Sequence, residues 1–284
     1  MPIIVSATLT APNYDNETSR LTGAVYDEDG TLVATCLRDS RLAWKHDDPE
    51  TLPSPPTNAE RLREARYLGR YIGHFGHFLI ETLPALARAG FDDLPLLFHP
   101  WGVPDAPGAG YRAFLLNALG IDEARIGFVR RVTVVDKLHV PDSLPNVILG
   151  DVDRATLDAY AFIRQAALRV TQATPHGGAI YLSRRAFDGR REVKGEDTVE
   201  DAFRRDGYTV IHPQQLPIHE QIGLVARAEA VAGFEGSALH LCGFMRPGSR
   251  VTVVTQDRPV PLAILAVNDA LGHVTTVIPS TGVG

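Results

Sequence analysis

The last 110 residues of the chain alternate short apolar runs with amphipathic segments, and this alternation constrains the fold more than any other feature. Apolar runs predict strands and amphipathic segments predict helices, because the two carry different hydrophobic periods. The expected strands are 179–183, 208–211, 229–232 and 251–254, and the expected helices are 197–205, 218–228, 237–245 and 260–270. Such a repeat is typical of a parallel sheet covered by helices. Residues 175–284 are therefore predicted to form a Rossmann-like α/β domain.

The first 174 residues show the same alternation less regularly. A turn sequence at 27–30 separates two apolar runs and favours a hairpin of residues 23–26 and 31–36. Four prolines within 47–58 exclude a helix or an inner strand there. Strands are expected at 94–98 and 132–135, and helices at 79–89, 111–119 and 153–173, with Gly90 and Gly120 ending the first two. The chain thus divides into a first domain, 1–174, and a second, 175–284.

Composition excludes several classes of protein. The chain has 28 basic and 34 acidic residues, a net charge of −6, which argues against binding that covers nucleic-acid phosphates. Two cysteines, Cys36 and Cys242, are too few for a disulfide scaffold. The first residues lack a signal-peptide pattern, and no run approaches about 20 apolar residues. We expect a cytoplasmic protein with no transmembrane segment; peripheral membrane contact and oligomeric state stay open.

One cluster of titratable residues stands out in the first half: His74, His77 and Glu81. On a helix beginning near Gly76, His77 and Glu81 are i,i+4 neighbours on one face. A carboxylate beside an imidazole fixes its tautomer and raises its basicity, as a general base requires. The same three residues could bind a metal ion through two imidazoles and a carboxylate, or form a polar helix start. The residues alone leave all three interpretations open.

A basic turn follows the first strand of the second half. Ser183, Arg184 and Arg185 stand where ligands bind in open α/β sheets, and paired guanidinium groups match phosphate oxygens. Residues 233–240 bring small side chains into a predicted helix start, which allows a phosphate to approach backbone N–H groups. Both segments should lie at one edge of the same sheet. The sequence therefore predicts a diphosphate site there, with a solvated basic turn as the alternative.

Other motifs carry less weight. Asp151-Val152-Asp153 has the Asp-x-Asp form of some metal sites, but it opens the long helix, where Asp153 is better interpreted as a cap. No Gly-x-Gly-x-x-Gly, Walker loop or Gly-x-Ser-x-Gly is present. Dehydrogenase, P-loop and serine-hydrolase functions therefore lack their defining residues.

Three blocks in order carry a family resemblance. Residues 77–84 contain His-x-x-x-Glu followed by Leu-Pro, residues 180–185 read Ile-Tyr-Leu-Ser-Arg-Arg, and residues 233–239 hold the small-residue turn. The chain resembles glycosyltransferase family 61, which includes bacterial capsular and exopolysaccharide transferases. The resemblance covers these blocks and the sequence that connects them, from about residue 70 to 255.

The resemblance implies a GT-B fold, in which two Rossmann-like domains face each other across a cleft. It implies an inverting, metal-independent transfer, without a cofactor, from a nucleotide sugar (UDP- or GDP-linked) to a hydroxyl of a saccharide acceptor. In that picture His77 and Glu81 deprotonate the acceptor. The implied donor-binding residues are Arg184, Arg185, Arg191, Glu235, Gly236, Ser237 and Leu239, with His74 and Gln221 as further cleft residues.

The chain departs from the family pattern at two places. Glu235 stands where the family has histidine, and Gly195-Glu196 stands where it has Asn-Glu. A carboxylate near a donor phosphate repels it unless it turns toward a sugar hydroxyl, so donor identity does not carry over. Two alternatives remain: a non-catalytic relative that binds nucleotide sugars or glycans, and a metal-dependent hydrolase using His74, His77 and Glu81.

Overall fold

The computed structural model divides the chain into two compact units, which we describe separately. It describes residues 1–12, 14–15, 20–21, 23–37, 57–102, 106–172, 178–186, 193, 195–256 and 258–282. The first unit comprises residues 1–109 and 120–146, and the second comprises 110–119 and 147–284. Helix α4 (Arg154–Val170), which the sequence analysis placed in the first domain, thus lies in the second unit. The expected boundary after residue 174 lies outside the described residues.

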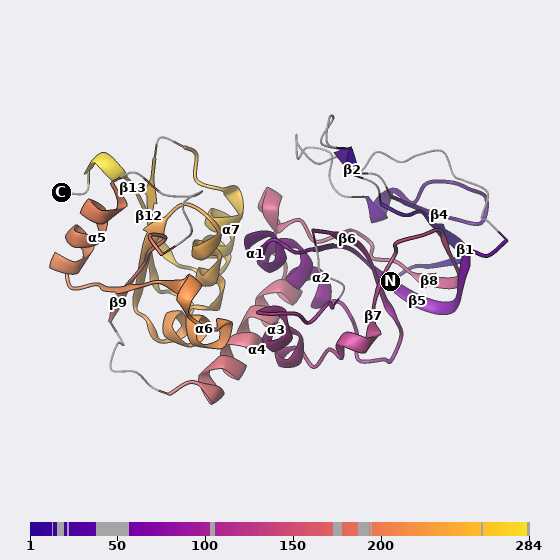
Figure 1. Ribbon diagram of the computed structural model, residues 1–284, viewed down its shortest axis with the longest axis horizontal. Coiled ribbons are helices and arrows are strands. Elements are labelled where there is room, and N and C mark those ends of the chain that lie inside the picture. Colours follow the sequence, from indigo (N-terminus) through magenta and orange to yellow (C-terminus); the bar gives the residue numbers. More distant parts are fainter. Residues whose placement is uncertain are drawn as a thin grey trace. The chain divides into compact units, whose positions relative to one another are not determined.

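A six-stranded mixed sheet forms the first unit (Figure 1). The strands run in the order β4-β1-β8-β5-β6-β7, and β8, β5, β6 and β7 are parallel. β1 pairs antiparallel with both β8 and β4. The bounds are β1 Ile3–Leu9, β4 Val25–Tyr26, β5 Glu60–Ile72, β6 Leu96–Trp101, β7 Ile126–Phe128 and β8 Thr133–His139; β2 (Tyr14–Asp15) and β3 (Arg20–Leu21) form a separate ribbon. The strands predicted at 94–98 and 132–135 are present with shifted ends.

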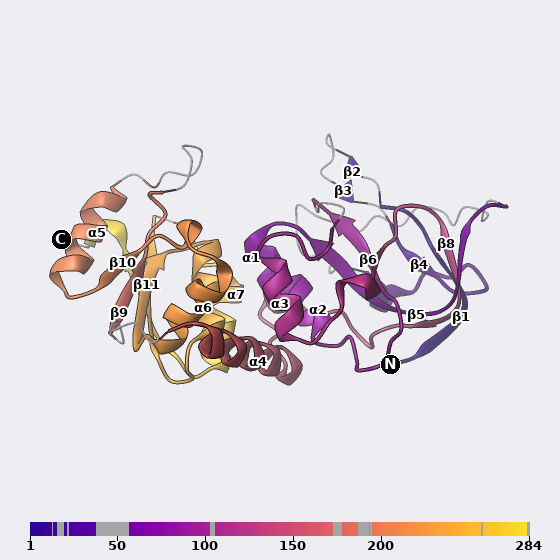
Figure 2. The same cartoon turned by 60° about the horizontal axis from the view of Figure 1, so that its bottom comes forward.

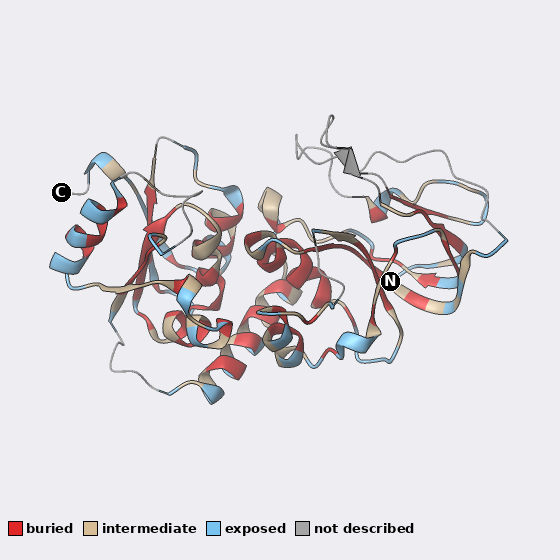
Figure 3. Ribbon diagram, viewed as in Figure 1, coloured by how far each residue is buried: buried red, intermediate tan, exposed pale blue. Residues whose placement is uncertain are grey.

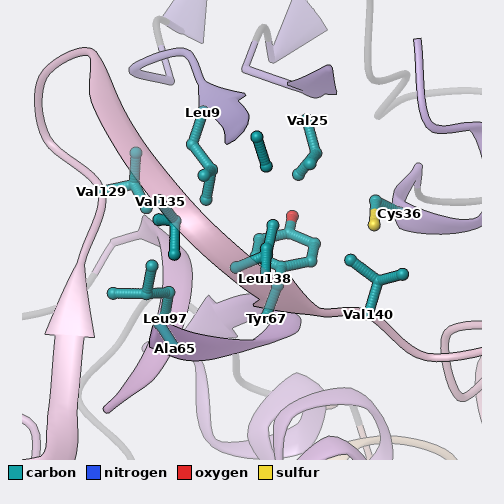
Figure 4. Packing of buried hydrophobic residues seen from close by; sticks show 11 residues of the cluster. Leu9, Val25, Cys36, Ala65, Tyr67, Leu97, Val129, Val135, Leu138 and Val140 are labelled. Atoms are coloured by element: carbon teal, nitrogen blue, oxygen red, sulfur yellow. The ribbon is translucent and has the colours of Figure 1, made fainter. Parts of the chain in front are cut away.

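The long strand β5 is central, with β8 and β6 as parallel neighbours. On one face of this sheet, buried side chains from β1, β5, β6 and β8 pack into the core shown in Figure 4. Tyr67 of β5 lies in that core and is 1% exposed. Since burying apolar surface is the main stabilising contribution to folding, this core fixes the sheet whose strand ends carry the site described below.

The hairpin predicted at 23–36 is only half correct. The turn is present, because the Asp27 carboxylate accepts hydrogen bonds from the backbone N–H groups of Asp29 and Thr31. β4, however, pairs with β1, and the second expected strand is replaced by a single bridge from Tyr26 to Leu32 and the 3₁₀ turn Ala34–Cys36. Most of the proline-rich segment, residues 47–56, lies outside the described residues.

A helical segment follows β5 and corresponds to the helix predicted at 79–89. It begins earlier than expected, as α1 (Phe75–His77), continues as one π-helical turn, η2 (Phe78–Thr82), and ends as α2 (Leu83–Leu86). Gly90 follows at φ +73°, a conformation that favours glycine after a helix. Figure 3 shows this segment mostly buried.

The second unit contains a five-stranded parallel sheet in the order β10-β9-β11-β12-β13 (Figure 2). Its strands are β9 Ala179–Leu182, β10 Thr209–Ile211, β11 Ala230–Phe234, β12 Arg250–Thr255 and β13 Val274–Pro279. The order of connections reverses between β9 and β11, and such a switch point is where open α/β sheets bind ligands. The parallel sheet predicted for this part of the chain is confirmed, and β13 is an additional strand that the sequence analysis did not identify.

Helices of the second unit are α3 (Arg112–Ala118), α4, α5 (Glu196–Arg205), α6 (Ile218–Arg227) and α7 (Leu262–Ala270). The Asp153 side chain accepts a hydrogen bond from the Thr156 N–H at 3.0 Å, which confirms the predicted cap of α4. Residues 237–245 were predicted as an α-helix; the structure instead has a 3₁₀ helix, η6 (Ser237–Phe244). Gly243 lets η6 approach α4 closely, because a Cβ there would lie 3.1 Å from the Tyr160 ring.

A fully buried histidine ties β6 to β5 and to the end of β1. The Tyr67 hydroxyl lies 2.7 Å from His99 Nδ1, and His99 Nε2 lies 2.8 Å from the Thr10 carbonyl. The carbonyl can only accept, so Nε2 carries the proton and Nδ1 accepts from Tyr67. Burial, together with the nearby Arg70 guanidinium, lowers the pKa of His99 from 6.5 to about 3.

We predict that His99 weakens the fold in acid. Below pH 6.5 the unfolded chain takes up a proton that the folded chain does not accept until its pKa of about 3 is reached. The free energy of unfolding should therefore fall with acidification through this window, by up to about 1.4 kcal/mol per pH unit from this residue. Urea unfolding at several pH values should show a shallower dependence in His99→Gln than in His219→Gln, a control that also removes one histidine. Equal slopes in the two variants would contradict the assignment.

Candidate functional site

In the first unit, the ends of the parallel strands β5 and β6 meet at one edge of the sheet. The Gly73 N–H, just after β5, donates to the carbonyl of Trp101, the last residue of β6, at 2.9 Å. Thr82 fixes the following helical segment to β5, because its hydroxyl accepts from the Ile72 N–H at 2.9 Å and donates to the Arg70 carbonyl at 3.3 Å. The helical segment is therefore held at the edge where open α/β sheets bind ligands.

His77 and Glu81 form a hydrogen-bonded pair across the π-helical turn. The distance from His77 Nδ1 to Glu81 Oε1 is 2.5 Å, and the side chains are 19% and 9% exposed. The predicted i,i+4 contact is confirmed. Single π-helical turns within α-helices are frequent at functional sites. With Nδ1–H donated to the carboxylate, Nε2 carries the lone pair and is the atom able to accept a proton.

Two more aromatic rings surround this pair. The ring centroids of His74 and His77 are 5.4 Å apart in an edge-to-face arrangement, and those of His77 and Trp101 are 6.4 Å apart. His74 thus lies beside the pair, as predicted. Across the described parts of the chain, no three His, Cys, Asp or Glu side chains are placed so that they could hold a metal ion. The metal site considered for His74, His77 and Glu81 is therefore not formed by these residues.

The second unit presents its basic turn directly after β9. The Ser183 N–H donates to the Ile211 carbonyl at 2.8 Å, which extends the pairing with β10 by one residue. The Ser183 hydroxyl donates to Glu200, and the Arg184 N–H donates to Glu196 at 2.8 Å. Both carboxylates come from α5. The turn after β9 is therefore held by hydrogen bonds to one helix.

The two neighbouring arginines have different partners. The Arg185 guanidinium pairs with Glu200 at 3.2 Å, and the same carboxylate pairs with Arg204 at 3.1 Å. Arg184 Nη1 instead donates to the Glu235 carbonyl at 3.4 Å, and it lies 3.5 Å from where a Cβ on Gly236 would stand. The expected meeting of the basic turn with the end of β11 is thus confirmed for Arg184. The Arg185 side chain is directed to α5.

The remaining predicted residues at the end of β11 differ in burial and in hydrogen bonding. Gly236 has φ +146° and precedes Ser237, the first residue of η6, so backbone rather than side chain lines this position. Leu239 is 1% exposed, and its side chain packs within 3.4 Å of the Cβ position at Gly233, which places it in the core. Glu235 Oε2 is buried and has no hydrogen-bond partner among the described residues.

Gln221, predicted as a cleft residue, contacts the chain just before its own helix. Gln221 donates its side-chain amide to the Leu216 carbonyl at 2.8 Å, so it stabilises the loop before α6. Arg191 lies outside the described residues.

Sequence reasoning missed the carboxylates of Glu196 and Glu200 as parts of this site. They are 2% and 0% exposed. A usable signal was present, because both share one face of α5 with the buried Val199 and Phe203 at i,i+3 and i,i+4 spacing. Burial raises the pKa of Glu196, while the hydrogen bond from the Arg184 N–H lowers it by a smaller amount.

No helix in the described ranges is both long enough and apolar enough to span a lipid bilayer.

Two solved structures are similar to the chain at low sequence identity. Among solved structures, the chain is similar to the dodecameric iron-containing heptosyltransferase TibC in complex with ADP-D-β-D-heptose, with 12% identity, 89% of this chain and 74% of that chain covered, and a TM-score of 0.34. The structure described as TibC from enterotoxigenic E. coli H10407 matches with the same identity and coverage and a TM-score of 0.32. No curated protein matches the chain in a sequence search.

The family match covers the residues whose geometry is described above. Residues 75–252 match the family described as Glycosyltransferase 61, and this range includes the His77–Glu81 pair, the turn after β9 and the end of β11. The match spans more than half of the chain, so the protein belongs to glycosyltransferase family 61 and is a glycosyltransferase.

Proposed function

We propose that the protein transfers a sugar from a nucleotide-sugar donor to a hydroxyl of a saccharide acceptor, with inversion at the anomeric carbon and without a metal ion. The observation that carries this proposal is the 2.5 Å hydrogen bond between His77 and Glu81, both largely buried, at the carboxyl ends of the parallel strands β5 and β6. An acceptor hydroxyl is a weak nucleophile at neutral pH and needs a base as it attacks. A carboxylate-supported imidazole provides that base.

In the proposed step, His77 Nε2 accepts the proton of the acceptor hydroxyl while its oxygen bonds to the anomeric carbon. The bond from that carbon to the departing phosphate oxygen breaks on the opposite face, which inverts the configuration. Glu81 keeps the imidazole in the required tautomer and stabilises the imidazolium that forms, because a charge-assisted hydrogen bond strengthens as the ring becomes cationic. We therefore assign His77 as the immediate base and Glu81 as its orienting partner.

The leaving diphosphate is assigned to the switch point between β9 and β11. Its developing negative charge requires a cation when no metal ion takes part. Arg184 fits this need, since within the described residues its guanidinium makes no salt bridge and donates a hydrogen bond of 3.4 Å to the Glu235 carbonyl. We assign a UDP- or GDP-sugar as the donor, with Glu235 turned toward a hydroxyl of the donor.

The proposal follows the GT-B plan, with donor binding assigned to the second unit and the acceptor base to the first. The five-stranded parallel sheet with its switch point supports the donor assignment. The proposal includes a cytoplasmic location and a role in building a polysaccharide or other glycan.

A thermal-shift screen against nucleotide sugars, followed by a transfer assay with the donors that bind, tests the proposal. A donor at 100 times its dissociation constant should stabilise the protein by about 2.7 kcal/mol. Binding without turnover on a panel of saccharide acceptors would favour a non-catalytic relative over the transferase.

The base assignment predicts a selective loss of turnover. Glu81→Gln keeps the size of the side chain but removes its charge, so single-turnover rates should fall by about 10²–10⁴ while donor affinity changes by a few fold at most. His77→Ala should behave similarly. The double variant should lose far less than the product of the single losses, because the pair acts as a unit.

The chain offers a matched control for these variants. His139 and Glu64 form the same kind of pair, 2.8 Å apart, between β8 and β5. Glu64→Gln and His139→Ala should leave the rate unchanged. Rates near wild type in both Glu81→Gln and His77→Ala would remove the base assignment.

Donor recognition should depend on the charge of Arg184. Arg184→Ala should raise the KM for the donor by about tenfold or more and leave the acceptor KM nearly unchanged, since a charge-assisted contact contributes about 1.5–3 kcal/mol. Arg205→Ala removes an exposed arginine of the same unit and serves as the control. Steady-state kinetics with both substrates varied will separate the two effects; an unchanged donor KM in Arg184→Ala would place the diphosphate elsewhere.

Transfer should persist in excess EDTA. Asp153, the last residue of the Asp-x-Asp sequence, is occupied as the cap of α4, with its carboxylate accepting from both the N–H and the hydroxyl of Thr156. Rates measured before and after chelation should agree. Loss of activity that magnesium or manganese restores would show instead that a metal ion takes part.

A further inference from the structure

Two carboxylates from one helix converge on the turn after β9. Glu196 and Glu200 lie four residues apart on α5, and both are almost completely buried. Burying a carboxylate is unfavourable unless hydrogen bonds or opposite charges compensate for the lost water. Their partners therefore show what these two side chains hold in place.

Each carboxylate holds a different part of the turn. Glu196 Oε1 accepts from the Arg184 backbone N–H at 2.8 Å and from the Tyr181 hydroxyl at 3.4 Å. Glu200 accepts from the Ser183 hydroxyl and from the Arg185 guanidinium. Together they fix both the backbone and the side chains of residues 183–185. We call this pair the carboxylate clamp.

The two arginines leave the turn after β9 in different directions. Arg185 lies in a turn in which its backbone N–H donates to the Ser183 hydroxyl at 3.1 Å. Tyr181, Ser183 and Arg185 all reach carboxylates of α5. Arg184 points the other way, toward the end of β11, where it meets the Glu235 carbonyl.

The two arginines also differ in the charged groups that surround them. The hydrogen bond and the charge of Glu200 raise the pKa of Arg185, and Arg204 balances the same carboxylate. A phosphate at Arg185 would have to compete with this buried carboxylate. Burial raises the pKa of Glu196, and the charge of Arg184 lowers it by a smaller amount. Within the described residues, however, Arg184 forms no salt bridge, and a phosphate there would displace a contact of 3.4 Å to the Glu235 carbonyl rather than a paired carboxylate.

We propose that the carboxylate clamp divides the Ser-Arg-Arg turn into two parts: Arg184 alone receives the diphosphate of the donor, and Arg185 neutralises Glu200 without touching the donor. Glu196 and Glu200 are positioning residues, which act on the ligand through Arg184. This inference rests on the proposed function and changes one expectation of the sequence analysis, which assigned both arginines to the donor.

A comparison of two neighbouring variants tests the division. Isothermal titration with UDP, GDP, ADP and inorganic diphosphate as probes should show affinity falling by about tenfold or more in Arg184→Ala, with Tm unchanged. Arg185→Ala should keep affinity within about threefold but lower Tm by about 2–4 °C, because Glu200 loses one of its two cations. Arg185→Lys, which keeps a cation beside Glu200, should restore part of the Tm. This variant replaces Arg185→Ala in the binding comparison if the alanine variant does not fold.

Salt dependence separates direct contact from positioning. Removing a cation that contacts phosphate makes affinity less sensitive to ionic strength. Arg184→Ala should therefore flatten the dependence of affinity on salt, and Arg185→Ala should not. Glu196→Ala should weaken binding without flattening it, and Glu196→Gln should restore binding because its amide oxygen can accept from the Arg184 N–H.

The outcomes distinguish this inference from the proposed function. If Arg185→Ala lowers affinity and flattens the salt dependence as much as Arg184→Ala, the division is overturned while the donor site remains. If the wild-type protein binds none of the four probes, both the division and the donor assignment fail. The crossed pattern, with affinity lost in one variant and Tm lost in the other, supports the division.

Discussion

Parallel pairing of strands is the constraint on which both candidate sites depend. In a parallel sheet every strand ends at the same edge, so residues that follow different strands meet there although the chain separates them widely. Gly73 meets Trp101 after β5 and β6, and Arg184 meets Glu235 after β9 and β11. Neither meeting follows from a local motif. Each exists because hydrogen bonding along the full length of the strands fixes their relative register.

A second physical theme is common to both units. A basic residue near a strand end is positioned by a carboxylate that is mostly or fully buried and comes from a helical segment: Glu81 for the imidazole of His77, and Glu196 for the backbone of Arg184. Such carboxylates destabilise the fold unless they are fully hydrogen-bonded, so their presence indicates a gain other than stability. In each case the gain that we propose is a defined orientation for a residue with ligand-binding or proton-transfer chemistry. Rigid support of this kind matters because small displacements of a reacting group lower the rate strongly.

Local patterns predicted the second unit well and the first unit poorly. The strands and helices after residue 178 follow short, regular periods that do not depend on distant contacts. β5 is different: its sequence is rich in Arg, Glu, Leu and Ala, yet it is the central strand of its sheet, because parallel neighbours on both sides supply its backbone partners. The helix α4 was predicted from its amphipathic pattern, but that pattern does not indicate against which of the two sheets the helix packs. At the sites, the spacing of His77 and Glu81 was sufficient to predict their contact, whereas the separate roles of Arg184 and Arg185 depend on the carboxylates of α5, which the sequence alone does not place.

Because residues Phe78–Thr82 form a π-helical turn, the geometry of the site depends on the number of residues in this stretch as well as on their identity. Its hydrogen bonds span five residues instead of four, so the turn accommodates one residue more than an α-helical turn closed at the same place. Deleting a single residue here would let the segment relax into a regular α-helix and would rotate one end of it relative to the other by about 100°, the angle per residue of an α-helix. The apolar side chains could find new positions in the core, but His77 and Glu81 could not both keep theirs. Homologous sequences that are one residue shorter in this stretch should therefore retain the fold and the contact between the two residues, which i,i+3 spacing also allows, but direct the pair to a different side of the helix. Length variation at this point would then distinguish active transferases from relatives with another role.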